Sequence, residues 1–369
     1  MNINELLKHV VDQKASDLHL TVGVPPTIRL KGRLVRLEGP PLKPADTEEL
    51  TRQVLSEDKF ELLKQRGEMD VSYSAYGVGR FRTSIYHQRG TIGMVVRVIS
   101  TEVPDLSNLG LPDIISKLSL NPQGIILVAG PTASGKSTTL AAMVNHINSQ
   151  KACHILTLED PIEYLFSHNE GLINQREIGS DSGSFSSALR SALRQDPDVI
   201  MVGEMEDMDT VSTAITAAET EHLVMGAMYA ADAPQAVERL IEMFPDHLQA
   251  HVRMQLAENL VAVIVQRLLP RKDGNGMVAA VEFLVVTPSI KSLIRNKSIQ
   301  QLYSVMRSGA KPGMQTIDNH IMSLYEKNLI EAREALENAT DRPTMARFLS
   351  RANHGLEDEE GEKEEEDIY

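Results

Sequence analysis

The chain has one cysteine and no tryptophan, and aromatic residues make up only 4% of its 369 residues. A single thiol, Cys153, excludes an internal disulfide framework and a zinc site built from four cysteines. The sequence also lacks an apolar run long enough to cross a bilayer, and it lacks the basic and then apolar start of a secretory signal. We therefore expect a cytoplasmic protein.

The chain also has fewer basic than acidic residues, and its formal net charge is −14. Residues 357–367 hold nine acidic residues and one lysine, which account for −8 of that charge. Such a run predicts a disordered, solvated tail over residues 352–369, with a docking role as the alternative. The acidic balance disfavours a nucleic-acid partner and a nucleic-acid translocase.

Residues 1–100 combine two helical patterns with alternating strand patterns. An apolar helical face runs from residue 2 to residue 13, and a longer helical pattern runs from Thr47 to about Gln65. The strand patterns form a hairpin around Gly32 and three further strands between Met69 and Ile99. These patterns predict a small α+β domain, and the proline-containing stretch 101–123 reads as a linker with a short helix.

From residue 124 onward the periodicity alternates between strand and helix. Short apolar strands are expected at 124–129, 154–158, 199–202 and 223–229, with helices at 138–149, 185–195 and 208–219. This alternation predicts an α/β domain over 124–287, built on a mostly parallel sheet that is covered on both faces. Residues 288–351 show only helical patterns and form the expected C-terminal helical segment.

The apolar run Ile125–Ala129 leads directly into a glycine-rich loop that carries a lysine and a serine. The pattern is G-x-x-x-x-G-K-[ST], the phosphate-binding loop, with an expected strand before it and an expected helix after it. Its backbone N–H groups would bind a nucleotide, the lysine would reach the β- and γ-phosphates, and the serine hydroxyl would hold Mg²⁺. The predicted nucleotide-binding residues are Gly130, Pro131, Thr132, Ala133, Ser134, Gly135, Lys136, Ser137 and Thr138.

Carboxylates follow two of the expected strands. Glu159, Asp160 and Glu163 come after the strand at 154–158, and Glu204 comes after the strand at 199–202. Ligands bind at the carboxyl ends of strands in open α/β sheets, and carboxylates there can hold Mg²⁺ and orient water. Asp160 followed by Pro161 also fits an ordinary helix start. The predicted metal ligands are Ser137, Glu159, Glu163 and Glu204.

Two groups of arginines could meet a phosphate. Arg190 and Arg194 lie one helical turn apart, and Arg80 and Arg82 share one face of a strand, with Arg97 on the next strand. An arginine that reaches a neighbouring subunit's site can stabilise the charge of phosphoryl transfer. A solvated basic face or surface ion pairs would explain the same residues.

Taken together, these motifs resemble the secretion and pilus motor ATPases, specifically the PilT/PilU type IV pilus retraction family, over residues 1 to about 350. The segments that carry the resemblance are Gly130–Thr138, Leu156–Glu163, Gln175–Glu177, Ala188–Asp198, Val202–Met205, Ala218–Thr220 and, as a retraction signature with several differences, Thr287–Asn296.

The resemblance implies a PAS-like N-terminal domain, a RecA-like motor domain and a ring of six identical subunits. It implies that Glu163 and Glu204 handle Mg²⁺ and water, that His222 takes part in catalysis, and that Arg80, Arg82 and Arg97 complete the site. It further implies ATP as the nucleotide, a position at the base of a pilus, and contact with the inner membrane only through a platform protein.

Four residues near the site depart from the family pattern. Tyr229 stands where the family has a second histidine and cannot become cationic near the γ-phosphate. Glu221 and Ala133 replace glycines, and Glu206 replaces a common arginine. Two functions follow: a hexameric, Mg-ATP-dependent motor for pilus retraction, or a weakly hydrolytic paralogue that binds nucleotide and supports a partner ATPase.

Overall fold

The computed structural model describes residues 1–308 and 313–352. The chain separates into two compact units. The first unit contains Met1–Glu102 and Pro161–Leu165, and the second contains Val103–Asp160 and the residues from Phe166 on. The predicted acidic run over 357–367 lies outside the described residues. In the described part of the chain, no helix combines the length and the apolar character that crossing a bilayer needs.

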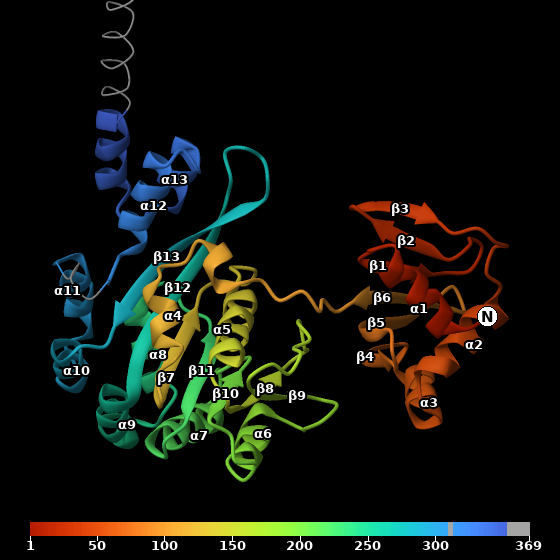
Figure 1. Ribbon diagram of the computed structural model, residues 1–369, viewed down its shortest axis with the longest axis horizontal. Coiled ribbons are helices and arrows are strands. Elements are labelled where there is room, and N and C mark those ends of the chain that lie inside the picture. The colour runs from red at the N-terminus through yellow and green to blue at the C-terminus, as the bar shows by residue number, and fades with distance from the viewer. Residues whose placement is uncertain (309–312, 353–369) are drawn as a thin grey trace, which may run out of the picture. The chain divides into compact units, whose positions relative to one another are not determined.

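The first unit is built on an antiparallel sheet of six strands in the order β3-β2-β1-β6-β5-β4 (Figure 1). Its elements are α1 (Ile3–Asp12), β1 (Asp17–Leu20), β2 (Thr27–Leu30), β3 (Arg33–Arg36), α2 (Pro44–Val54), α3 (Glu57–Arg66), β4 (Glu68–Ala75), β5 (Gly79–Gln88) and β6 (Thr91–Val98).

The two faces of this sheet differ because side chains alternate along each strand. Leu18, Phe81, Ile85 and Met94 belong to one core with the buried side chains of α1, α2 and α3. The opposite face carries the charged residues of the same strands, including Asp17. The first unit is therefore an α+β domain in which the helices cover the apolar face.

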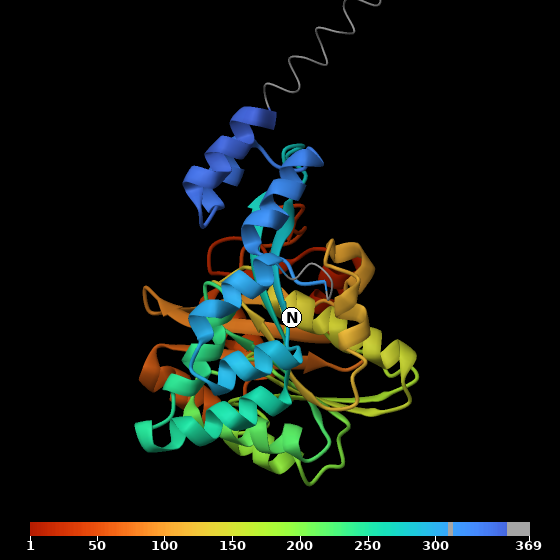
Figure 2. The ribbon, with the colours of Figure 1, turned by 90° about the vertical axis from the view of Figure 1, so that its left-hand side faces the viewer.

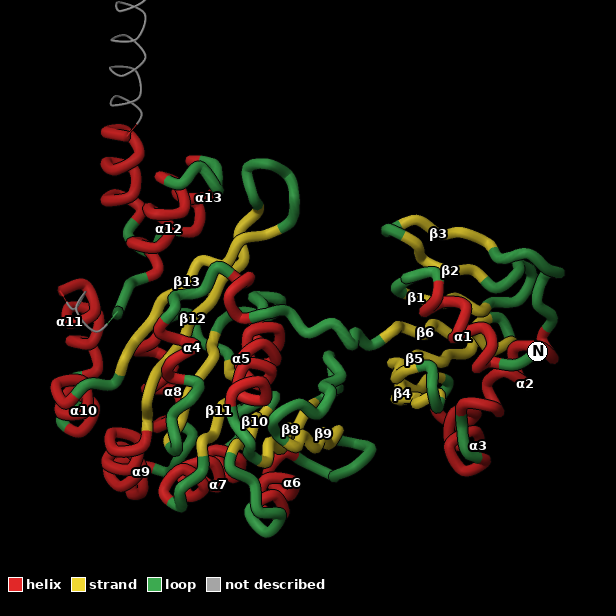
Figure 3. The backbone as a smooth tube through the Cα atoms, viewed as in Figure 1, coloured by secondary structure: helices red, strands yellow, loops and turns green. Residues whose placement is uncertain are grey.

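The second unit is built on a sheet of seven strands in the order β13-β12-β7-β11-β10-β8-β9 (Figure 3). Its elements are the 3₁₀ helix η1 (Leu106–Leu109), α4 (Ile114–Leu118), β7 (Gly124–Ala129), α5 (Lys136–Gln150), β8 (His154–Glu159), β9 (Leu172–Glu177), α6 (Phe185–Ala192), β10 (Val199–Val202), α7 (Met208–Glu219), β11 (Leu223–Met228), α8 (Ala233–Glu242), α9 (Asp246–Asn259), β12 (Leu260–Pro270), β13 (Met277–Val285), α10 (Pro288–Arg295), the 3₁₀ helix η2 (Ile299–Gln301), α11 (Leu302–Ser308), α12 (Ile317–Glu326) and α13 (Ala332–Asn338).

Helices cover both faces of this sheet, as the parallel pattern predicts (Figure 2). Alternate residues of β7 enter different cores: Leu127 packs with α6 to α11, whereas Val128 packs with η1, α4 and α5. Strand β13 is the antiparallel member, paired with β12. The predicted α/β class is confirmed. Buried Leu106 and Ile115, from the stretch predicted as a linker, belong to the second of these cores.

The structure corrects two details of the predicted elements. The helical pattern from Thr47 to Gln65 is two helices, because Leu55 and Ser56 adopt extended backbone between α2 and α3. Strands β9 and β12 and helices α8 and α9 are elements that the sequence patterns did not predict.

The C-terminal helices are tied to the β12–β13 hairpin by two charged side chains. Glu282 on β13 is 1% exposed, and its carboxylate accepts hydrogen bonds from the N–H groups of Ala233 (2.7 Å) and Ile317 (3.3 Å), the first residues of α8 and α12. Arg267 on β12 donates through Nη1 to the carbonyl of Asn338 at 2.9 Å. These bonds connect the sheet to the start of α12 and to the end of α13.

Candidate active site

The glycine-rich loop joins the end of β7 to the start of α5, so its backbone lies at the carboxyl end of the sheet. Gly130 and Gly135 have φ angles of 147° and 89°, which favour glycine. A Cβ on Gly130 would lie 2.3 Å from the carbonyl oxygen of Gln266, and a Cβ on Gly135 would lie 2.8 Å from its Nε2. Only glycine fits these two positions, which keeps the loop narrow enough to wrap a phosphate.

Lys136 begins α5 directly after the loop. Its Nζ donates to the carbonyl oxygens of Pro131 (2.7 Å) and Gly130 (3.0 Å), so the ammonium group lies over the loop. The N–H groups of the first turn of α5 and the positive end of its dipole face the same side. The predicted phosphate-binding residues therefore form a cradle that suits an anionic group.

A buried amide from β12 supports this cradle from beneath. Gln266 is 4% exposed, and its Oε1 accepts a hydrogen bond of 2.8 Å from the hydroxyl of Thr139, which is fully buried on α5. Sequence reasoning missed Gln266, although it is the one amide in the apolar run from Leu260 to Leu269. An amide in such a run is the signal that could have identified it, because a buried amide needs a partner.

The strand register brings Glu204 to the same edge of the sheet as the loop. The sheet contains four neighbouring parallel strands, β7, β11, β10 and β8. The loop after Ala129 and the turn after Val202 therefore both follow the carboxyl end of a strand, at the same edge of the sheet. Burial raises the pKa of Glu204, and the nearby carboxylates of Glu206 and Asp160 raise it further, whereas Lys136 acts in the opposite direction. Glu204 and Lys136 are thus within electrostatic reach of each other.

Glu159 ends β8 and is 7% exposed. Its Oε1 accepts hydrogen bonds from the Thr157 hydroxyl at 2.6 Å and from Nε2 of Gln175 at 3.0 Å. Across residues 1–308 and 313–352, no three His, Cys, Asp or Glu side chains are grouped so that they could hold a metal ion. Mg²⁺ at such a site usually keeps several waters and takes few protein ligands besides the phosphates.

The structure does not bring His222 to the phosphate-binding loop of its own chain. His222 precedes β11, whose first residue Leu223 pairs with Gly124 at the start of β7. The loop follows the other end of β7, roughly 20 Å away at about 3.3 Å per residue. Nδ1 of His222 instead lies 3.0 Å from the carbonyl of Ala217. The catalytic role of His222, which the family resemblance implies, therefore stays a prediction that the geometry within one chain does not support.

Tyr229 follows the end of β11 that lies beside the loop, since Met228 pairs with Ala129. Its ring is 5.6 Å from the guanidinium of Arg239, and Nη1 of Arg239 donates to the Tyr229 carbonyl at 3.1 Å. A cation is thus present next to this tyrosine, although a phenol cannot itself become cationic.

Ala133 and Glu221, which stand where the family resemblance expects glycine, both have a backbone conformation that glycine favours. Ala133 has a φ of 60° and Glu221 has a φ of 68°, both in the left-handed region. A side chain in this region costs free energy that glycine avoids. Both residues therefore carry backbone strain, and that of Ala133 lies within the phosphate-binding loop.

The two helical arginines make local contacts. An Nη2 nitrogen of Arg190 on α6 lies 3.7 Å from a carboxylate oxygen of Asp209 on α7, and both side chains are more than half exposed. Nη1 of Arg194 donates to the carbonyl of Arg190 at 3.2 Å. The contact of Arg190 agrees with the alternative of a surface ion pair, and within the described residues Arg194 donates only to a backbone carbonyl.

The other predicted arginines and Glu163 belong to the first unit. Arg97 donates through Nε to Oδ1 of Asp17 at 2.8 Å, Arg82 lies 4.0 Å from Asp70, and Nη1 of Arg80 donates to the Ser74 hydroxyl at 3.3 Å. Glu163 lies in Pro161–Leu165, a segment that pairs with Ser100 through Tyr164 and Leu165. Sequence reasoning missed Asp17, although the alternation Asp17-Leu-His-Leu put it on one face of a strand.

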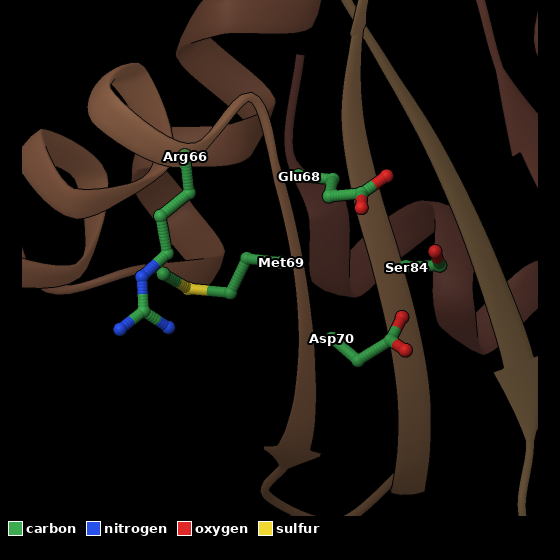
Figure 4. A pocket seen from close by; sticks show the side chains of 5 residues that line it. All are labelled: Arg66, Glu68, Met69, Asp70 and Ser84. Atoms are coloured by element: carbon green, nitrogen blue, oxygen red, sulfur yellow. The ribbon is translucent and has the colours of Figure 1, made fainter.

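A hollow of about 410 Å³ lies at the β4 edge of the first unit, lined by Arg66, Glu68, Met69, Asp70 and Ser84 (Figure 4). The Met69 side chain extends toward Arg66, whereas Glu68, Asp70 and Ser84 lie to the other side of β4. Two carboxylates against one guanidinium do not suit a phosphate. This hollow is therefore not an alternative nucleotide site.

Comparison with known proteins identifies relatives over most of the chain. The profile of the family described as "Type II/IV secretion system protein" matches residues 1–278. The "Type IV pilus retractation ATPase PilT" of Pseudomonas aeruginosa is 43% identical over 339 residues, which cover 92% of this chain and 98% of that protein. The "Type IV pilus ATPase PilU" of the same organism is 40% identical over 339 residues, covering 92% of this chain and 89% of that protein.

Solved structures give the same fold. A crystal structure of the pilus retraction motor PilT with bound ADP superimposes with a TM-score of 0.85 at 43% identity, covering 94% of this chain and 99% of that chain. The ATPase DotB of Legionella pneumophila superimposes with a TM-score of 0.79 at 26% identity, covering 90% of this chain and 93% of that one.

Proposed function

This chain belongs to the family of type II/IV secretion system proteins, and from this premise we propose that it is the ATP-hydrolysing motor of type IV pilus retraction. The relatives named PilT and PilU, which match along nearly their whole length, support the assignment to pilus retraction. The single structural observation that carries the proposal is the phosphate cradle at the end of β7, with Lys136 over the loop and Glu204 on the same sheet edge.

In this function, residues Gly130 to Thr138 bind the phosphates of ATP. Lys136 exchanges its bonds to the carbonyls of Gly130 and Pro131 for bonds to phosphate oxygens, which are stronger because donor and acceptor are both charged. Ser137 and Glu204 would hold Mg²⁺, and the ion would neutralise charge on the phosphates when it is bound. From the same place at the end of β10, Glu204 would also orient the attacking water and take its proton.

We further place the site at the boundary between neighbouring copies in a ring of six. Arg80, Arg82 and Arg97 of one copy would supply positive charge to the triphosphate bound by another, and Glu163 would assist in orienting water. The expected location is the cytoplasmic side of the inner membrane at the pilus base, with a platform protein of the pilus as the partner. The proposed output is a change in ring shape when nucleotide binds and is released.

A second candidate is a weakly hydrolytic paralogue that binds nucleotide and supports a partner ATPase. Tyr229 beside the loop favours it, because a phenol cannot supply the cation that a histidine could supply there. The similarity to PilU, a second pilus ATPase of one organism, fits this candidate as well.

ATP turnover by the purified full-length chain separates the two candidates. The motor function predicts measurable turnover that Lys136→Ala and Glu204→Ala each abolish, and loss of retraction in cells that carry either variant. Turnover of the unaltered chain no higher than that of Glu204→Ala would favour the paralogue, and measurable turnover that Lys136→Ala leaves unchanged would contradict the motor function.

A further inference from the structure

One row of paired positions crosses the polar face of the first unit from edge to edge. Each member lies directly opposite the next on a neighbouring strand, about 5 Å apart. In order from β3 to β4, the row contains Leu34, Arg29, Asp17, Arg97, Arg82 and Ser72. Three arginines and one carboxylate therefore stand side by side.

This arrangement concentrates positive charge. Arg97 and Arg82 are directly opposite each other on β6 and β5, and like charges at such positions destabilise a sheet. Asp17 is the one carboxylate in the row and is 3% exposed, whereas the Arg97 side chain is 69% exposed. Asp70, which lies 4.0 Å from Arg82, is a second carboxylate beside the row, so three arginines face two carboxylates and one net positive charge remains. The buried carboxylate of Asp17 thus holds the exposed guanidinium of Arg97 in a row that is still positive.

The two oxygens of Asp17 have different partners. Oδ1 accepts from Nε of Arg97 at 2.8 Å. Oδ2 accepts from the Ser16 hydroxyl at 2.7 Å and lies 3.6 Å from Nε of Arg29. Ser16 and Arg29 therefore hold the carboxylate through Oδ2, whereas Oδ1 accepts its one hydrogen bond within the described residues from Arg97. Burial by itself would raise the pKa of Asp17, but the hydrogen bonds from Arg97 and Ser16 lower it, so the group is ionised.

We infer that Asp17 is the positioning residue of this arginine row: by binding Arg97 through Nε, it directs the two terminal nitrogens of that guanidinium toward a phosphate. Within the described residues, Nε is the one nitrogen of Arg97 with an acceptor. A guanidinium that donates through Nε still has Nη1 and Nη2 for a second acceptor. A lysine in its place has one compact ammonium group, which would pair with Asp17.

His19 shares this face with the row and is affected by burial and by the same two arginines. It lies two residues after Asp17 on β1, and its pKa is lowered by burial and by the charges of Arg29 and Arg97, which outweigh the opposite effect of Asp17. Its Nε2 is buried and has no hydrogen-bond partner in the described part of the chain. Burial, together with the charges of Arg29 and Arg97, therefore disfavours a charged His19 on this face.

The inference rests on the proposed function, in which Arg97 serves phosphoryl transfer, and a double-mutant cycle tests it. Asp17→Asn, Arg97→Ala and their combination are compared in the full-length chain for ATP turnover and for ADP affinity. Misplacing a charge-stabilising group costs on the order of tenfold to a hundredfold in turnover. We expect a loss of this size in both single variants, no further loss in the double variant, and ADP affinity within about twofold of the unaltered chain, because both residues act on the same guanidinium.

Multiplicative losses in the double variant, or normal turnover of Asp17→Asn while Arg97→Ala is impaired, would overturn the role of Asp17 and leave the proposed function intact. Normal turnover of Arg97→Ala would instead contradict the arginine contribution in the proposed function. Asp46→Asn is the matched control, because Asp46 caps α2 through the Lys43 N–H at 2.7 Å, away from the row.

Arg97→Lys tests the inference with a variant that is expected to fold normally. This variant retains the charge and the ion pair with Asp17, but it loses the second donor edge. We expect it to be as impaired as Arg97→Ala at an unchanged melting temperature. Turnover equal to that of the unaltered chain would show that the Nε bond directs nothing, and would overturn the inference.

Discussion

Raising the pH through neutrality should weaken the attachment of the C-terminal helices, because it ionises Glu282. This carboxyl group is buried on β13, and burial raises its pKa from 4.5 to about 7. The charge of Asp232 also raises the pKa, whereas the N–H groups of Ala233 and Ile317 and the charge of Arg267 lower it. The neighbouring His320 is neutral across this range, since burial lowers its pKa to about 4.

The sign follows from proton binding. Between pH 4.5 and 7 the folded chain keeps a proton on Glu282 that the unfolded chain has lost, so stability falls as the pH rises through this window and levels off above it. A shift of this size corresponds to about 3 kcal/mol, at 1.36 kcal/mol per pKa unit. Glu282→Gln resembles the protonated form at every pH, so its stability should not fall as Glu282 of the unaltered chain ionises.

Urea unfolding followed by circular dichroism at pH 5, 6, 7 and 8 measures the effect as a difference between variants, which cancels other titrating groups. We expect the free energy of unfolding of Glu282→Gln relative to the unaltered chain to rise by about 2.5 kcal/mol from pH 5 to pH 8, because part of the full effect lies below pH 5. Glu258→Gln is the control, because Glu258 is an exposed carboxylate paired with Lys291 and Arg295. Parallel pH curves for the unaltered chain and Glu282→Gln would refute the reasoning.

Three further predictions concern the backbone and the hairpin. Ala133→Gly should stabilise the chain by about 1 kcal/mol in denaturant unfolding, because it relieves a φ of 60°; an unchanged or lower midpoint would contradict the strain. Gly130→Ala should weaken ADP binding by tenfold or more in calorimetry, since the new Cβ would lie 2.3 Å from the Gln266 carbonyl; unaltered affinity would show that the loop can shift. Arg267→Ala should speed proteolytic release of α13 by removing its bond to Asn338, and an unchanged cleavage rate would assign that attachment to apolar packing.

Much of the site could be predicted from the sequence because its parts are local. The cradle consists of consecutive residues between one strand and one helix, and the conformations of Gly130 and Gly135 are dictated by the motif itself. The same holds for Glu204, which follows a short apolar strand directly. Family resemblance supplied the general architecture, since the relevant motifs are spread over most of the chain.

The missed elements share a physical cause. Strand β12 is a long apolar run that sequence periodicity alone does not separate from a buried helix, and β9 carries Asn174, Gln175 and Arg176 at an edge of the sheet. The single helix predicted over 47–65 failed because Ser56 starts a new helix from an extended backbone, a local break without glycine or proline.

Sequence by itself determined where the phosphate loop lies, which face of each strand is polar and which strand ends carry acids, because these properties depend on neighbouring residues. Only the tertiary structure decided which of these residues meet. Strand direction put His222 at the far end of the sheet, pairing between β7 and β12 put Gln266 under a loop more than a hundred residues earlier in the chain, and sheet order put Asp17 against Arg97. Contacts between distant segments depend on strand order and register, and no local pattern in the chain specifies either.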